Sequence, residues 1–211
     1  YISRSADVTA GHPILIDEFL EDAFEFDVDA LSDGDQTYIA GIMEHIEQAG
    51  VHSGDSSCSI PPITLNKKIQ DEIINQMIAF TKKLNVIGLV NAQFAVRNNE
   101  IYILEVNPRA SRTVPFVSKA TGNQLAKIAA KVMIGIPIKD QGENYSHSPN
   151  FYSVKGPVFP FNKFPDTDPI LGPEMKSTGE VMGTGNTFGE AYIKAQYAAG
   201  TEFPKSGNVF I

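Results

Sequence analysis

Residues 89–109 decide the fold, and they read Leu89-Val-Asn91-Ala-Gln93-Phe-Ala-Val-Arg97-Asn-Asn-Glu100-Ile-Tyr-Ile-Leu-Glu105-Val-Asn107-Pro-Arg109. Two runs of alternating apolar and polar residues flank Asn98-Asn99, a pattern typical of a β-hairpin. Apolar residues occupy the even positions of both runs, and the odd positions include Asn91, Gln93, Glu105 and Asn107. The sequence therefore predicts one apolar face and one polar face for this hairpin.

The register of the hairpin determines whether the polar residues lie together. A two-residue loop at Asn98-Asn99 puts Glu105 on the face opposite Gln93. A three-residue loop, with one asparagine left-handed, pairs Arg97 with Ile101 and Gln93 with Glu105. We predict the three-residue loop, because only that register keeps the apolar residues on one face.

The polar face carries a carboxylate and amide carbonyls, which are hard oxygen ligands that suit Mg²⁺ together with phosphate oxygens. Pro108 ends the second strand, and Arg109 and Arg112 follow where they could hold phosphate bidentately. The alternative interpretation is a half-exposed hairpin with a solvated polar face, because any one-sided antiparallel sheet shows this alternation.

Length and composition set limits on the function. With 211 residues, 42% hydrophobic and 20% charged, the chain can bury one sizeable core and resembles an ordinary soluble globular protein. A net charge of −8 argues against non-specific binding to nucleic acids or anionic membranes. The single cysteine, Cys58, excludes an internal disulfide and indicates a reducing cytosol. No membrane span or signal peptide is visible, and both ends indicate part of a longer polypeptide.

Strands and helices follow each other without a regular β-α-β alternation, which predicts the α+β class with a mainly antiparallel sheet packed with helices. The clearest helix is expected over Asn66–Leu84, where apolar residues recur at helical spacing. The other expected elements are strands at 14–20, 24–30, 37–43 and 152–159, helices at 122–133 and 187–199, and the opening of a strand at 207–211.

Three further patterns carry weaker signals. Glu25, Asp27 and Asp29 alternate along one strand, which is most simply explained by a solvent-facing row, although Glu25 could accept hydrogen bonds from ribose hydroxyls. His52 lies between glycines and is more often a structural donor than a catalyst. Residues 183–189 lack the ending of a phosphate-binding P-loop, so we expect a turn with Thr187 as the N-cap of the last helix.

The segment Glu105-Val-Asn107-Pro-Arg109-Ala-Ser-Arg112-Thr-Val-Pro-Phe-Val-Ser-Lys119-Ala-Thr-Gly122 resembles the ATP-grasp signature of carbamoyl-phosphate synthase large chains. Residues 43–56, 160–165 and 171–182 resemble the same family, so the likeness covers nearly the whole chain. The Thr-Val-Pro-Phe and Phe-Asn-Lys-Phe runs resemble its second, C-terminal synthetase half. Biotin carboxylases share the Glu-x-Asn opening but usually continue Thr-Arg.

The resemblance implies an ATP-grasp C-terminal subdomain over residues 1–200, without its lid portion, and the start of a regulatory, methylglyoxal-synthase-like domain at 201–211. It also implies a cytoplasmic ligase that phosphorylates carbamate with ATP for arginine and pyrimidine biosynthesis. The implied partners are the rest of the large chain and a small glutaminase subunit, with no nucleic acid or membrane. The isolated chain is expected to have weak or no catalytic activity.

The resemblance also assigns roles to individual residues. Gln93, Glu105 and Asn107 would bind Mg²⁺ or Mn²⁺ at the ATP phosphates, and Arg109 and Arg112 would stabilise the transferring phosphoryl group. The remaining implied nucleotide contacts are Glu18 and Leu20 at adenine, Glu25 at ribose, and Gly50, Val51, His52 and Ser53 along the nucleotide. An implied potassium site comprises Glu25, His45, Gln48, Val51 and Ser56.

Two alternatives remain open from the sequence. In the first, the chain is a catalytically inert piece that serves in packing, allosteric relay or subunit contact. Another ATP-grasp carboxylate-amine ligase is the second alternative, which the Pro108-Arg109 pair disfavours.

Overall fold

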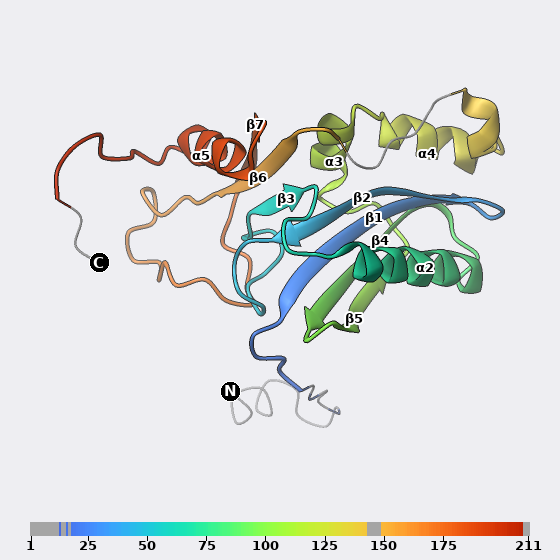
Figure 1. Ribbon diagram of the computed structural model, residues 1–211, viewed down its shortest axis with the longest axis horizontal. Coiled ribbons are helices and arrows are strands. Elements are labelled where there is room, and N and C mark those ends of the chain that lie inside the picture. The colour runs from blue at the N-terminus through green and yellow to red at the C-terminus, as the bar shows by residue number, and fades with distance from the viewer. Residues whose placement is uncertain (1–12, 14–15, 17, 143–148, 209–211) are drawn as a thin grey trace.

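The computed structural model describes residues 13, 16, 18–142 and 149–208. Within them, seven strands form one antiparallel sheet in the order β5-β4-β1-β2-β3-β6-β7 (Figure 1). This confirms the predicted α+β class with its mainly antiparallel sheet. The elements are β1 (Phe24–Asp33), β2 (Thr37–His45), β3 (Cys58–Ile60), α2 (Lys67–Lys83), β4 (Ile87–Arg97), β5 (Glu100–Asn107), α3 (Val114–Thr121), α4 (Leu125–Met133), the 3₁₀ helix η1 (Ile138–Gln141), β6 (Tyr152–Val158), β7 (Gly179–Gly185) and α5 (Phe188–Ala198).

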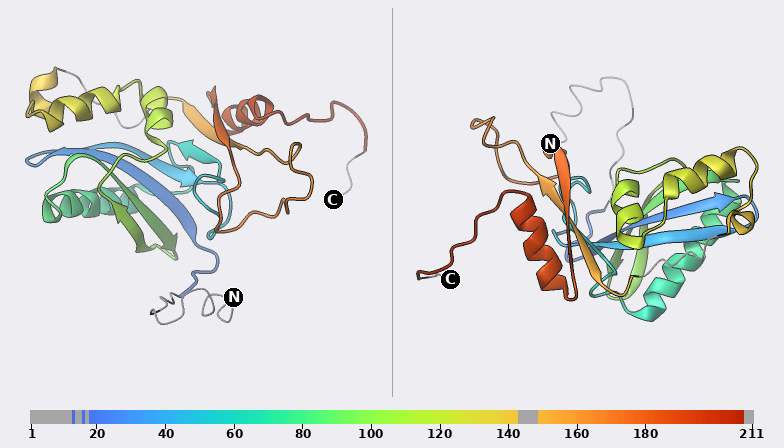
Figure 2. Two further views of the ribbon diagram at one scale, coloured as in Figure 1. Left: turned by 180° about the vertical axis from the view of Figure 1, so that it is seen from behind. Right: turned by 90° about the horizontal axis from the view of Figure 1, so that it is seen from above.

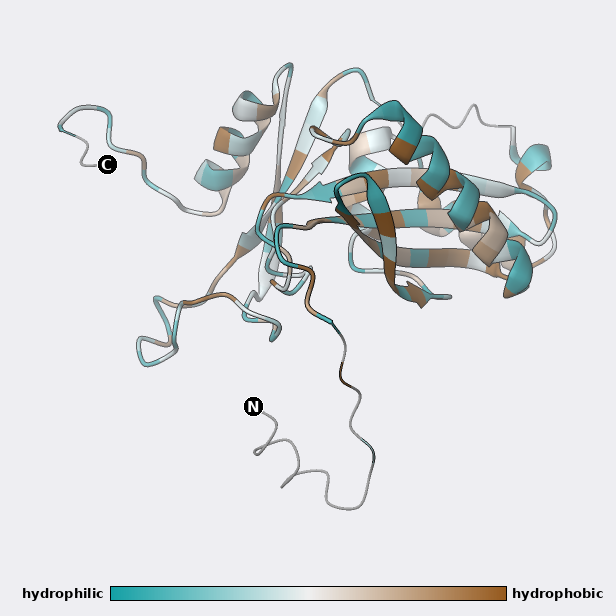
Figure 3. Cartoon of the chain, turned by 60° about the horizontal axis from the view of Figure 1, so that its bottom comes forward, coloured by the Kyte–Doolittle hydropathy of each residue, from teal (hydrophilic) through white to brown (hydrophobic). Residues whose placement is uncertain are grey.

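Helices cover both faces of the sheet, so the core has two layers (Figures 1 and 2). On one face α2 packs the fully buried Ile73 and Met77 against strand residues that include Phe94. On the other face α3 packs against Met43, and α4 packs against Leu31. Figure 3 shows alternating polar and apolar segments along α2, as expected for a helix with one buried face. The polar site described below therefore lies on a sheet that is fixed by apolar packing.

The three predicted helices are confirmed as α2, α5 and α4, the last of which begins at Leu125 and not at residue 122. Side chains cap the first two. Asn66 caps α2 by accepting a hydrogen bond from Ile69 N (3.0 Å). Thr187 caps α5 by accepting from Glu190 N (3.2 Å). Helix α3 was not predicted, because it is only eight residues long and has Pro115 in its first turn, where proline is tolerated.

The hairpin loop differs from the prediction. Arg97 pairs with Glu100 through a two-residue loop in which Asn98 (φ 52°) and Asn99 (φ 65°) are both left-handed, so the predicted three-residue loop is wrong. A β-bulge then makes Leu104 the extra residue of β5. The bulge restores the predicted pairing of Gln93 with Glu105, so both side chains still lie on one face.

Two other expectations need correction. Asp27 and Asp29 are 2% and 1% exposed and Glu25 is half-buried, so the row on β1 is not solvent-facing. Residues 18–20 do not form a strand, and most of the expected 14–16 segment lies outside the described residues. The expected strand at 207–211 also lies largely outside them, and residues 207–208 are not in a strand.

Among the described residues, no helix is long and apolar enough to cross a membrane.

The two-residue loop gives a test of the hairpin. Replacing Asn99 with valine should lower the free energy of unfolding by about 1–2 kcal/mol, because a β-branched residue is strained in the left-handed region. Asn99→Gly should change it little, since glycine adopts this conformation freely. Urea denaturation of both variants measures the difference, and equal stabilities would contradict the loop geometry.

Candidate functional site

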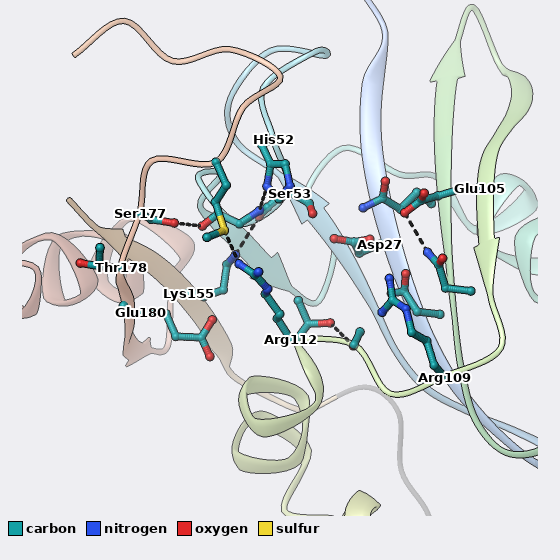
Figure 4. Close-up of a pocket in the computed structure, with 18 residues that line it drawn as sticks. Asp27, His52, Ser53, Glu105, Arg109, Arg112, Lys155, Ser177, Thr178 and Glu180 are labelled. Carbon is teal, nitrogen blue, oxygen red and sulfur yellow. Dashed lines mark hydrogen bonds between the residues drawn. The ribbon is translucent and has the colours of Figure 1, made fainter. Parts of the chain in front are cut away.

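A pocket of about 530 Å³ lies where β1, β4 and β5 face the loops that lead into β3 and β7 (Figure 4). Glu105 and Arg109 approach it from one side, and Lys155, Ser177 and Thr178 approach it from the other. Its lining is rich in charged and amide groups, which indicates a site for a polar, charged ligand.

The first wall consists of oxygen-bearing side chains on adjacent strands. Gln93 lies opposite Glu105, and Asn91 lies opposite Asn107, so all four point from the same face of the β4–β5 pair. Asn107 Nδ2 donates to Glu105 Oε1 (2.8 Å), which orients both groups. The structure thus brings together the three side chains predicted to bind a divalent cation, and all three line the pocket.

The segment after β5, residues 108–113, is called here the arginine loop. Arg109 and Arg112 are both exposed and both line the pocket. Between and after them, Ser111 and Thr113 turn toward the sheet and hydrogen-bond to the buried carboxylate of Asp29 at 2.7 and 2.6 Å. The two guanidinium groups therefore extend from a loop that is attached to the floor of the site.

The opposite wall is held by two buried groups. Lys155 of β6 is 2% exposed, and its Nζ donates to Ser53 O (3.0 Å). The fully buried carboxylate of Asp55 accepts from Lys176 N and Ser177 N, both at 2.8 Å. These bonds connect the loop at residues 53–55 to β6 and to the segment that precedes β7. A buried lysine beside a pocket supplies positive charge where an anionic ligand would bind.

A buried charge cluster lies beneath the pocket on β1 and β2. His45 Nε2 lies 3.0 Å from Asp27 Oδ2, and its Nδ1 lies 3.5 Å from Glu25 Oε2. Burial raises the pKa of Asp27, but the hydrogen bond and charge of His45 outweigh burial, so this pKa falls below its usual value. Burial lowers the pKa of His45, but Cys58, Asp27 and Glu25 together hold it well above its usual value. Both shifts favour the charged forms of this pair.

The donor set fits a divalent cation with phosphate ligands. One carboxylate and two amides converge from Glu105, Gln93 and Asn107, which are hard oxygen donors. Asp27 Oδ1, also in the pocket lining, is buried and has no hydrogen-bond partner within the described part of the chain. No group of three His, Cys, Asp or Glu side chains that could hold a metal occurs in that part of the chain.

The predicted nucleotide contacts divide into two groups. His52 and Ser53 line the pocket, but Glu25 does not, and it accepts a hydrogen bond from Gly50 N (3.0 Å). Glu18 is exposed and Leu20 is half-buried, both outside the pocket lining. Of the other residues predicted for the nucleotide or potassium, Gly50 and Gln48 are exposed, Val51 is half-buried, and His45 and Ser56 are buried.

Sequence reasoning missed several residues of the site, among them Asp27, Lys155, Ser177 and Glu180. The sequence does carry a signal for Lys155, which is a lysine in the middle of a largely apolar strand. A lysine is rarely buried in such a strand without a function or a partner. No comparable signal marks Ser177 and Glu180, since polar residues near glycine-rich segments are common in loops.

The sequence matches the family model described as "Carbamoyl-phosphate synthase L chain, ATP binding domain" over residues 2–141. The chain is 56% identical over its whole length to the carbamoyl phosphate synthase large chains of Ralstonia nicotianae and Vibrio cholerae, and 58% identical to that of Pasteurella multocida. It spans 20% of the length of each of these relatives.

Solved structures show the same fold at low sequence identity. The biotin carboxylase domain of a single-chain bacterial carboxylase superposes with a TM-score of 0.61 at 14% identity, covering 76% of this chain and 43% of that one. The urea amidolyase of K. lactis gives a TM-score of 0.65 at 14% identity, covering 83% of this chain and 12% of that one. These likenesses confirm the predicted ATP-grasp fold.

Proposed function

The chain belongs to the family of carbamoyl-phosphate synthase large-chain ATP-binding domains, and on that premise we propose that its pocket binds ATP with a divalent cation and serves in the phosphorylation of carbamate. The observation that carries the proposal is the pairing of Gln93 with Glu105 beside Asn107, opposite the buried Lys155. Hard oxygen donors and fixed positive charge then flank one polyanionic ligand.

The chemistry is phosphoryl transfer. A carbamate oxygen attacks the γ-phosphorus of ATP, the bond from that phosphorus to the β,γ-bridging oxygen breaks, and carbamoyl phosphate and ADP form. Arg109 and Arg112 bind the equatorial oxygens of the transferring group and stabilise their charge, and Lys155 adds a fixed positive charge. Gln93, Glu105 and Asn107 would hold Mg²⁺ or Mn²⁺, which would supply neutralisation of the phosphate charge when bound.

Several finer assignments belong to the same proposal. We place the chain in the second, C-terminal synthetase half of a cytoplasmic enzyme for arginine and pyrimidine biosynthesis, with a small glutaminase subunit as partner. Residues 1–200 belong to the ATP-grasp domain, and residues 201–211 begin a regulatory domain. Glu18 and Leu20 are proposed at adenine, Glu25 at ribose and Gly50–Ser53 along the nucleotide, with potassium at Glu25, His45, Gln48, Val51 and Ser56.

Calorimetry with the nonhydrolysable analogue AMP-PNP tests the ATP site in the chain as it stands. We expect saturable binding in the presence of Mg²⁺, and a loss of affinity of at least about tenfold when the cation is removed, because the carboxylate of Glu105 then repels the phosphates. Equal affinity with and without Mg²⁺ would contradict the metal assignment. No binding under either condition would favour the inert packing or allosteric role.

A further inference from the structure

Asp29 is a buried carboxylate on β1 that the proposed chemistry does not use. It is 1% exposed, and it accepts hydrogen bonds from Asn91 Nδ2 (2.9 Å), Ser111 Oγ (2.7 Å) and Thr113 Oγ1 (2.6 Å). Ser111 and Thr113 flank Arg112 in the arginine loop, 82 and 84 residues along the chain from Asp29. Such long-range bonds fix a loop that has no regular secondary structure of its own.

The bonds form a closed ring. Ser111 Oγ and Thr113 Oγ1 also lie 2.7 Å from each other, so three short oxygen–oxygen contacts join Asp29, Ser111 and Thr113. Two hydroxyls provide only two protons for these three contacts. The third proton can come from the carboxyl group, and burial raises the pKa of Asp29 to about 6 although the three donors lower it.

We propose that Asp29 is a positioning residue, which holds Arg109 and Arg112 toward the ligand phosphates through its hydrogen bonds to Ser111 and Thr113. The inference rests on the proposed function only for the identity of the ligand. Both arginines are exposed and have no acidic partner among the described residues. Arg109 Nη1 donates to Ala110 O within the same loop (3.1 Å), and Arg112 Nη1 contacts Met175 Sδ, so the attachment of the loop to Asp29 is the buried anchor that both side chains share. A side chain on a loop that is already fixed before binding loses less conformational entropy when it binds phosphate.

The ring predicts opposite outcomes for two substitutions. Asp29→Ala removes all three acceptor contacts and detaches the arginine loop. Asp29→Asn completes the ring, because its amide can donate to Thr113, Thr113 to Ser111, and Ser111 to the remaining carbonyl oxygen. The conservative variant should therefore keep the loop in place without the negative charge.

Limited proteolysis tests the attachment without any ligand, since trypsin cleaves after Arg109 and Arg112. The measured quantity is the ratio of the cleavage rate at these two bonds to the cleavage rate after the exposed Lys163. We expect Asp29→Ala to raise this ratio about tenfold and Asp29→Asn to leave it at the wild-type value. Met77→Ala, on the opposite face of the sheet, is the control for a general loss of stability and should leave the ratio unchanged. Should Asp29→Ala fail to fold, Thr113→Val carries the same test.

Calorimetry with Mg·AMP-PNP then tests the consequence for binding. Asp29→Ala should weaken binding about tenfold in the wild-type background and not further once Arg109 and Arg112 are both alanine, because the effect passes through them. Unchanged cleavage ratios in both Asp29→Ala and Thr113→Val, or additive losses of affinity, would overturn the positioning role. If the wild-type chain binds no nucleotide, the proposed function fails, and the cleavage ratios still decide whether Asp29 holds the loop.

Discussion

Glu105→Ala is expected to lower the affinity for Mg·AMP-PNP at least about 100-fold, the largest binding effect that we predict for a single substitution. Glu105 is the one carboxylate among the three oxygen donors that pair across β4 and β5. Its removal leaves two neutral amides, which are weak ligands for a hard divalent cation. Titration calorimetry in Mg²⁺ measures the loss, and the Mg²⁺ dependence should disappear with it.

Glu100→Gln is the matched control. Glu100 is an exposed carboxylate on the same strand, at the hairpin end, where it accepts a hydrogen bond from Tyr102. Its substitution removes one negative charge from β5 without touching the pocket, so the affinity should stay within about twofold. Equal losses for the Glu100 and Glu105 variants would mean that the loss at Glu105 does not come from coordination of the cation.

The hairpin shows which structural features the periodicity of the sequence can predict. Alternation predicted both strands and the face that carries Gln93, Glu105 and Asn107. It could not predict the bulge, because one extra residue in β5 changes the register only locally. The predicted pairing of Gln93 with Glu105 is confirmed, but the loop proposed to produce it is wrong.

The burial of the charged residues could not be predicted from the sequence. Alternation on β1 looks the same whether Asp27 and Asp29 face water or a second layer. They are buried because their partners come from distant segments: His45 reaches Asp27, and Ser111 and Thr113 reach Asp29. Lys155 likewise finds its acceptor at Ser53, 102 residues away. Contacts of this range depend on the tertiary fold and leave no local periodic signal.

Asp29→Asn should increase the stability of the chain, relative to wild type, as the pH rises. The pKa of Asp29 is about 6 in the folded chain and 3.8 as the unperturbed value, so the folded state binds the proton more tightly. The contribution of this group to wild-type stability is then fully present below about pH 4 and is lost as the pH rises through about 6. The loss amounts to about 3 kcal/mol as an upper value. Asparagine does not titrate, so it avoids this loss.

The measurement is the difference in free energy of unfolding between Asp29→Asn and wild type, from urea denaturation at about pH 4 and about pH 8. Taking the difference cancels the titration of the other groups. Asp33→Asn provides a control: burial raises the pKa of Asp33, but hydrogen bonds from the backbone of Gln36, Ile138 and Asp35 outweigh burial and lower it below 3.8. The stability that Asp33 contributes is therefore lost only as the pH falls below about 4, and its variant should change little relative to wild type between about pH 4 and about pH 8. If the Asp29 variant loses stability relative to wild type as the pH rises, the ring requires the charged carboxylate and the proton assigned to it is wrong.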